Sequence, residues 1–98
     1  MKITSKTEAD KLTMSISGRL DTSTAPELET ELKSKLAGVK EFIIDLADLE
    51  YISSAGLRVL LSAQKTMNKQ GSMKLINVQE TIMEIFDITG FTDILTIE

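Results

Sequence analysis

A continuous apolar run, Phe42-Ile43-Ile44, lies next to segments with helical periodicity, and it constrains the fold more than any other feature. A strand without polar alternation is typical of a position that is covered on both faces, as in a parallel sheet. Before this run, Leu28, Leu32 and Leu36 recur at every fourth residue, which predicts a helix with one apolar stripe. Strands that alternate with helices in this way indicate an α/β fold with right-handed crossovers.

The other segments complete one domain over residues 1–98. Leu12, Met14 and Ile16 alternate with polar residues and predict a half-buried strand, which forms a hairpin with a weaker strand through Ala9-Asp10. The expected strands cover residues 3–7, 12–17, 42–45, 73–78 and 94–97, and the expected helices cover 24–38, 54–70 and 81–88. This order, β-β-α-β-α-β-α-β, predicts a mixed, largely parallel sheet with helices packed on it.

Turn and cap signals set the expected boundaries. Gly18 is expected to end the second strand, so that residues 19–21 form a loop. Thr24 and Glu27 have the spacing of a capping box, and Pro26 fits the first turn of the helix because it needs no intrahelical donor. Asp45 and Asp48 are three residues apart after a strand, and turn formation explains them better than paired catalytic carboxylates.

Missing residue types exclude several kinds of site. The sequence has no Cys and no His, which excludes disulfides, thiolate or imidazole zinc sites and the Ser-His-Asp triad. The five glycines are isolated, so none of them forms a phosphate-binding glycine loop. We therefore expect a protein that is not an enzyme and that holds no metal or cofactor.

Charge and hydropathy narrow the partners. Eleven basic residues against fifteen acidic ones give a net charge of −4, and with one Tyr and no Trp the chain lacks the surface that nucleic acid requires. It contains no apolar run of membrane-spanning length, and its start does not resemble a signal peptide. We expect a cytoplasmic domain that neither binds nucleic acid nor inserts into a membrane.

The segment that follows the central strand carries the strongest functional signal. In an open α/β sheet, ligands bind beyond the carboxyl ends of the parallel strands, and Ser53 and Ser54 fall at that edge before a helix. An N-cap explains one of the two serines. Gly56 costs about 1 kcal/mol relative to Ala inside a helix, which indicates that another group approaches the backbone closely there.

The charges along this segment are uneven. Residues 51–79 contain no acidic residue but include four basic ones, whereas residues 21–50 contain eight acidic residues and three basic ones. A phosphate at the start of this helix would meet little repulsion and would be favoured by the helix dipole. The alternative interpretation is a solvated basic face.

Three segments resemble the STAS domain of the bacterial anti-sigma factor antagonist family, and the resemblance extends over the whole chain. They are Gly18-Arg19-Leu20-Asp21-Thr22, Ile43-Ile44-Asp45-Leu46 and, most specifically, Tyr51-Ile52-Ser53-Ser54-Ala55-Gly56-Leu57. The family's motif reads Asp-Ser-Ser/Thr-Gly, and the serine after the Asp is phosphorylated. Aligned on Gly56, the acceptor is Ser54, and Ser53 takes the place of the Asp.

The resemblance implies a phosphorylation-controlled switch between partners. The unmodified protein is expected to bind an anti-sigma factor that is a serine kinase, phosphorylation of Ser54 to release it, and a serine phosphatase to restore binding. The expected partner surface comprises Asp21, Ser53, Gly56 and Arg58 around the acceptor. Asp21 could support phosphate transfer or cap the first helix. The alternative function is an unphosphorylated docking subunit of a lipid-transport or sensory complex.

Overall fold

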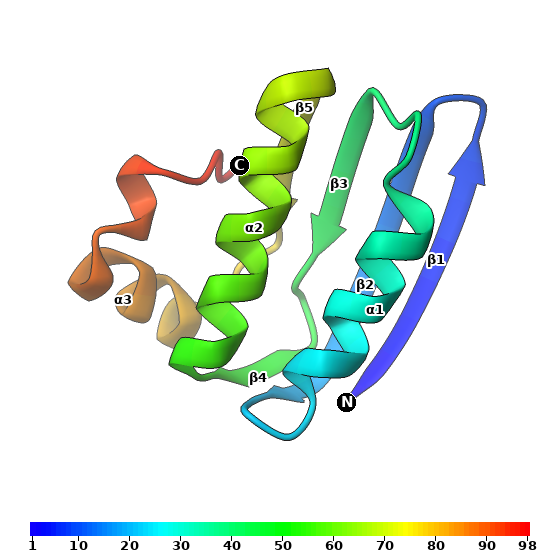
Figure 1. Ribbon diagram of the computed structural model, residues 1–98. Coiled ribbons are helices and arrows are strands. Elements are labelled where there is room, and N and C mark those ends of the chain that lie inside the picture. The colour runs from blue at the N-terminus through cyan, green and yellow to red at the C-terminus, as the bar shows by residue number, and fades with distance from the viewer.

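The computed structural model describes residues 1–98 and shows one mixed sheet with helices packed on it (Figure 1). The strands are β1 (Lys2–Glu8), β2 (Lys11–Leu20), β3 (Glu41–Asp45), β4 (Leu49–Ile52) and β5 (Ser72–Ile76). The helices are α1 (Ala25–Lys35), α2 (Ser54–Gln70) and α3 (Glu80–Thr89), followed by a short 3-10 turn, η1 (Phe91–Asp93). The strand order is β1-β2-β3-β5; β1 is antiparallel to β2, and the other pairs are parallel. This confirms the predicted fold class.

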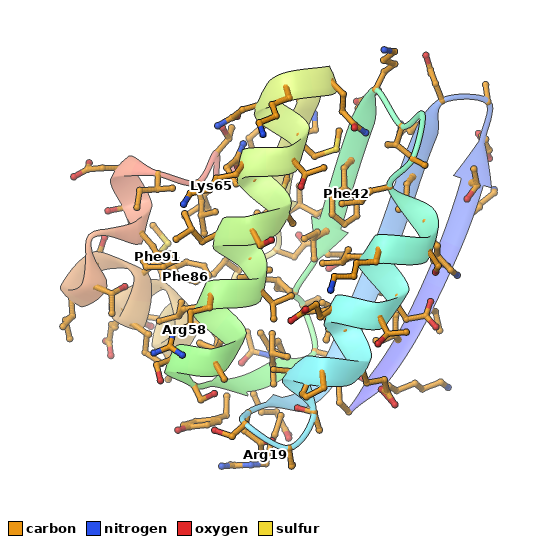
Figure 2. All side chains as sticks on the ribbon, viewed as in Figure 1. Arg19, Phe42, Arg58, Lys65, Phe86 and Phe91 are labelled. Carbon is orange, nitrogen blue, oxygen red and sulfur yellow. The ribbon has the colours of Figure 1, made fainter.

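Strand register separates the two faces of the sheet. Met14, Ile44 and Leu75 are aligned across β2, β3 and β5, and all three are fully buried. Helices α1 and α2 lie side by side over one face of the sheet, and α3 lies beyond α2 (Figure 1). Figure 2 shows Phe42 between the sheet and these helices, where the core of the domain forms.

Helix α2 forms because its apolar residues follow a 3.6-residue period. Leu57, Leu60 and Met67 are buried, whereas Arg58, Lys65 and other polar residues lie on the solvent side. The polar half keeps the helix at the surface of the domain. None of the helices is both apolar enough and long enough to cross a membrane.

The prediction that Gly18 ends the second strand is wrong. Gly18 has a φ of +86°, and the register between β2 and β4 shifts at Gly18/Arg19, which marks a bulge rather than an end. Beyond the bulge, β2 continues to Leu20 and pairs with β4, a strand that is absent from the sequence-based prediction. Leu20 and Ile52 pair in this register and are both buried, so core packing explains the extra pairing.

The predicted final strand is largely absent. Residues 91–93 form the turn η1, and only Ile97 bridges to Leu75 beside β5. Leu75 N donates to Thr96 O at 2.9 Å, and Glu98 N donates to Leu75 O at 2.9 Å. Leu95 is buried, Ile97 packs against the core, and Lys74 Nζ lies 3.7 Å from Glu98 Oε1, so side-chain contacts and these hydrogen bonds hold the end of the chain rather than a full strand.

Candidate functional site

The candidate site lies where the carboxyl ends of β2 and β4 meet the amino ends of α1 and α2. The two strands bring the segments together, because Arg19 pairs with Tyr51 and Leu20 with Ile52. Ser53 N then donates to Leu20 O at 2.9 Å, which ties the start of α2 to the end of β2. The loop after β2 and the serines at the start of α2 therefore share one edge of the sheet, as expected for an α/β fold.

Ser53 is the N-cap of α2. Its backbone is extended, with φ −97° and ψ 175°, and its hydroxyl accepts a hydrogen bond from Gly56 N at 3.4 Å. Ser53 O also accepts the first intrahelical bond, from Leu57 N at 3.0 Å. Residues with a short polar side chain are preferred at the N-cap, so capping explains Ser53 but not the adjacent Ser54.

Ser54 is the first residue of α2, and its side chain is exposed. The cap bond comes from Ser53, so the Ser54 hydroxyl is not used to close the helix end. The amide groups of Ser54 and Ala55 precede the first intrahelical bond, which begins at Leu57 N. A second molecule can therefore reach the Ser54 hydroxyl at a helix terminus that favours negative charge.

Gly56 is buried, and its expected place on the partner surface is wrong. A Cβ built on Gly56 would lie 2.7 Å from Leu20 Cγ and 2.9 Å from Ile52 Cγ1. The close approach that the sequence indicates is real, but the approaching groups belong to the core of this chain. Gly56 lets α2 settle onto the ends of β2 and β4, and this sets the position of Ser54.

Asp21 organises the loop between β2 and α1. Its Oδ1 accepts hydrogen bonds from Ser23 Oγ at 2.7 Å, Ser23 N at 3.0 Å and Thr24 N at 3.2 Å. The hydrogen bond from the Ser23 hydroxyl lowers the pKa of Asp21, with further support from the two amides, and outweighs desolvation, which acts in the opposite sense. Of the two roles left open for Asp21, this geometry favours the structural one at the start of α1.

The predicted capping box at Thr24 and Glu27 does not form. Thr24 makes no side-chain cap bond to α1. Its hydroxyl instead accepts from Asp21 N at 2.8 Å and donates to Arg19 O at 2.9 Å. The Asp21 carbonyl accepts from Ala25 N at 2.8 Å, so the turn that begins at Asp21 satisfies the first amides of the helix in place of the box.

Arg19 and Tyr51 form an exposed pair that sequence reasoning missed. The Arg19 guanidinium carbon lies 4.2 Å from the centroid of the Tyr51 ring, and Arg19 Nε lies 3.7 Å from Asp21 Oδ2. Tyr51 keeps 38% of its surface exposed. The pairing depends on β4 being a strand in register with β2, and no local sequence signal gives that register. Figure 2 shows Arg19 at the end of the molecule where α1 begins.

Arg58 lies one turn after Ser54 and is exposed. None of the five ion pairs in the protein includes it, and none includes Lys65 or Lys69 of the same helix. Thr22, Pro26, Ala55 and Arg58 are among the residues that line a cavity of about 270 Å³ between the first turns of α1 and α2. The site therefore carries free positive charge on α2 beside an exposed hydroxyl.

Asp45, the last residue of β3, has a structural role. Asp45 Oδ1 accepts hydrogen bonds from Ala47 N at 2.9 Å and from Asn77 Nδ2 at 3.2 Å. The first contact is turn chemistry, as predicted, whereas the second ties the end of β3 to the residue that follows β5. No three acidic side chains gather in an arrangement that could hold a metal ion.

Comparisons with known proteins agree with this fold. A family model described as "STAS domain" matches residues 2–98. The anti-sigma-B factor antagonist of Bacillus subtilis strain 168 is 36% identical over 93 residues, covering 94% of this chain and 85% of that protein. Two solved structures of SpoIIAA are 15% identical to the chain and share its fold. The unphosphorylated form has a TM-score of 0.85 and the phosphorylated Bacillus form 0.77; each covers 99% of this chain, and the chain covers 88% and 91% of theirs.

Proposed function

This chain belongs to the STAS domain family, and we propose that it is an anti-sigma factor antagonist controlled by phosphorylation of Ser54. In this proposal the unmodified protein acts in the cytoplasm and binds an anti-sigma factor that is also a serine kinase. Phosphorylation releases that partner, and a serine phosphatase restores binding. The observation that carries the proposal is the exposed Ser54 hydroxyl at the start of α2, beside a neighbouring serine that already caps the helix.

The kinase has to reach the acceptor, so the acceptor lies inside the interface. Transfer joins the Ser54 oxygen to the γ-phosphorus of ATP, releases ADP and passes the hydroxyl proton to a base of the kinase. The product carries about −1.5 to −2 charges at neutral pH. Burying that charge against a partner surface without a matching cation costs several kcal/mol, and each 1.4 kcal/mol is a tenfold loss of affinity.

Ser53, at the position of the family's Asp, adds no negative charge beside a phosphate on Ser54. A carboxylate there would stand directly beside a phosphoserine, whereas the Ser53 hydroxyl is neutral and is engaged by Gly56 N. The residues from 51 to 79 add no acidic group. On its own helix, a phosphate on Ser54 would therefore meet amides and basic side chains rather than like charge.

The fold itself is compatible with modification. SpoIIAA, which shares this fold, is described in an unphosphorylated and in a phosphorylated form, and both superimpose on this chain over 99% of its length. Ser54 is also exposed, so added charge reaches solvent rather than the core. We expect phosphorylation to change binding without unfolding the domain.

The direct test of the acceptor is mass spectrometry after incubation with ATP and a serine-kinase anti-sigma factor encoded beside the gene. Phosphate is expected on Ser54 alone. Ser54→Ala should abolish incorporation, whereas the matched control Ser53→Ala should retain it at a reduced rate because only the N-cap is lost. Phosphate on Ser53, or incorporation that persists in Ser54→Ala, would reject Ser54 as the acceptor.

A further inference from the structure

Arg58 stands four residues after Ser54 on α2, and both side chains are exposed. Residues four apart on a helix are neighbours, with Cβ atoms about 5–6 Å apart. We propose that Arg58 is the intramolecular receptor for the phosphate on Ser54. The inference rests on the proposed function for the modification itself, and it adds a role for Arg58 that begins only once the phosphate is present.

Arg58 has no competing partner in the unmodified protein. It takes part in none of the ion pairs, and its own helix has no acidic residue. Glu29 of α1 lines the same cavity, but its Oε1 lies 3.0 Å from Lys33 Nζ, so that carboxylate already has a cation. A phosphate on Ser54 would therefore not have to displace Arg58 from another group.

The chemistry of the arginine side chain suits it to receive a phosphate. Its guanidinium is always charged and offers several N–H donors in a planar fork that matches phosphate oxygens. The other nearby arginine is less available, because Arg19 stacks on Tyr51 and pairs with Asp21. Arg58 is thus the free guanidinium on the same helix as the acceptor.

Such a contact would give phosphorylation two effects on the partner surface. The phosphate adds negative charge at Ser54, and its contact with Arg58 removes a positive charge that the unmodified protein presents to the partner. A partner carboxylate that pairs with Arg58 would lose its cation at the moment the phosphate appears. The surface would change from positive to negative by local chemistry, with no movement of the backbone.

The test places phosphoserine at position 54 during translation, so that it does not depend on any kinase. Phosphorus NMR then follows the second pKa of the phosphate, ordinarily near 6, through a pH titration. A cation favours the dianion, so this pKa should be lower in the parent protein than in Arg58→Gln by at least about 0.3 of a pH unit. Arg58→Lys should keep most of the shift, because it keeps the charge.

Lys65→Gln is the matched control. Lys65 is an unpaired, exposed cation on the same helix, and Figure 2 shows it on the same side of α2 as Arg58. It is eleven residues from Ser54, about 16 Å along the axis, which is beyond the screening length of about 8 Å at physiological salt. Its removal should leave the phosphate pKa within about 0.1 of a pH unit.

A second measurement separates a contact from general charge effects. In nitrogen–proton spectra, the Nε–H signal of Arg58 should shift when residue 54 is phosphoserine, and the corresponding signal of Arg19 should not. Equal phosphate pKa values in the parent and Arg58→Gln, or an equal change in Lys65→Gln, would overturn the inference. If the NMR result holds and no kinase modifies Ser54, the receptor stands and the proposed function fails.

Discussion

Leu20 lies directly beneath Gly56: a Cβ on residue 56 would stand 2.7 Å from Leu20 Cγ. This contact joins the end of β2, which precedes the Asp21 loop, to the first turn of α2, which carries Ser54. Ser53 N reinforces the junction by donating to Leu20 O at 2.9 Å. The two halves of the candidate site are therefore held in place by the core rather than by surface contacts.

Gly56→Ala should destabilise the domain. The added methyl group meets Leu20 and Ile52 at distances that force a shift, and overpacking costs about 1–3 kcal/mol, partly offset by the better helix propensity of Ala. We expect a net loss of about 1–2 kcal/mol in urea unfolding, against less than about 0.5 kcal/mol for the exposed control Ser62→Ala. Unchanged stability would show that the junction is loose.

Gln70→Met should lower stability because it removes a tether between the ends of α1 and α2. Gln70 Nε2 donates to Leu36 O at 2.6 Å and to Val39 O at 2.7 Å in a part-buried position. Val39 O loses its donor and Leu36 O keeps only Val39 N at 3.1 Å, so we expect a loss of about 1–3 kcal/mol in urea unfolding. The control Gln79→Met breaks one exposed bond, to Ala47 O at 2.6 Å, and should cost clearly less. Equal losses in the two variants would contradict the tether.

Asp21→Asn should reveal a pH-dependent contribution to stability. The hydrogen bonds from Ser23 and Thr24 hold the pKa of Asp21 below its usual value in the folded state. A lowered folded pKa stabilises the protein above the unfolded value, and this contribution is lost as pH falls through the folded value. The melting temperature of the parent should therefore exceed that of the variant at pH 7, and this difference should narrow below about pH 4. A difference in melting temperature that does not change with pH would contradict ionisation of Asp21 as its cause.

Tyr51→Leu should weaken the pair with Arg19, whereas Tyr51→Phe should preserve it. The guanidinium carbon lies 4.2 Å from the ring centroid, and an exposed contact of this kind contributes about 0.5–1 kcal/mol. In an Arg19→Gln background, the cost of Tyr51→Leu in chemical unfolding should shrink by about that amount. If the cost is the same in both backgrounds, the stacking contributes nothing to stability.

The sequence was sufficient to predict the elements that follow a strong period. The buried run at residues 42–44, the alternation at 12–16 and the leucine stripe of α1 all appear where periodicity places them. The position of Ser53 and Ser54 at the start of a helix was also predicted, although the strand that directly precedes them, β4, was not. Each of these signals lies within one short segment, because the period of apolar residues along that segment reports which of its faces is buried.

Features that depend on distant segments were not predictable. Strand β4 exists because Leu49 and Ile52 are buried beside the bulged end of β2, and nothing within residues 49–52 alone specifies that partner. The same register creates the Arg19–Tyr51 pair. Gly56 signalled a close approach, but only the structure identifies Leu20 and Ile52 as the approaching groups.

The central claim is that a phosphate on Ser54 switches binding of the anti-sigma factor. Calorimetry should compare the affinity of the serine-kinase anti-sigma factor for unmodified protein, for Ser54→Ala and for protein with phosphoserine at position 54. We expect Ser54→Ala to bind as tightly as unmodified protein and the phosphorylated protein to bind at least about 100-fold more weakly. Equal affinity of the three proteins would contradict switching and would favour a docking subunit.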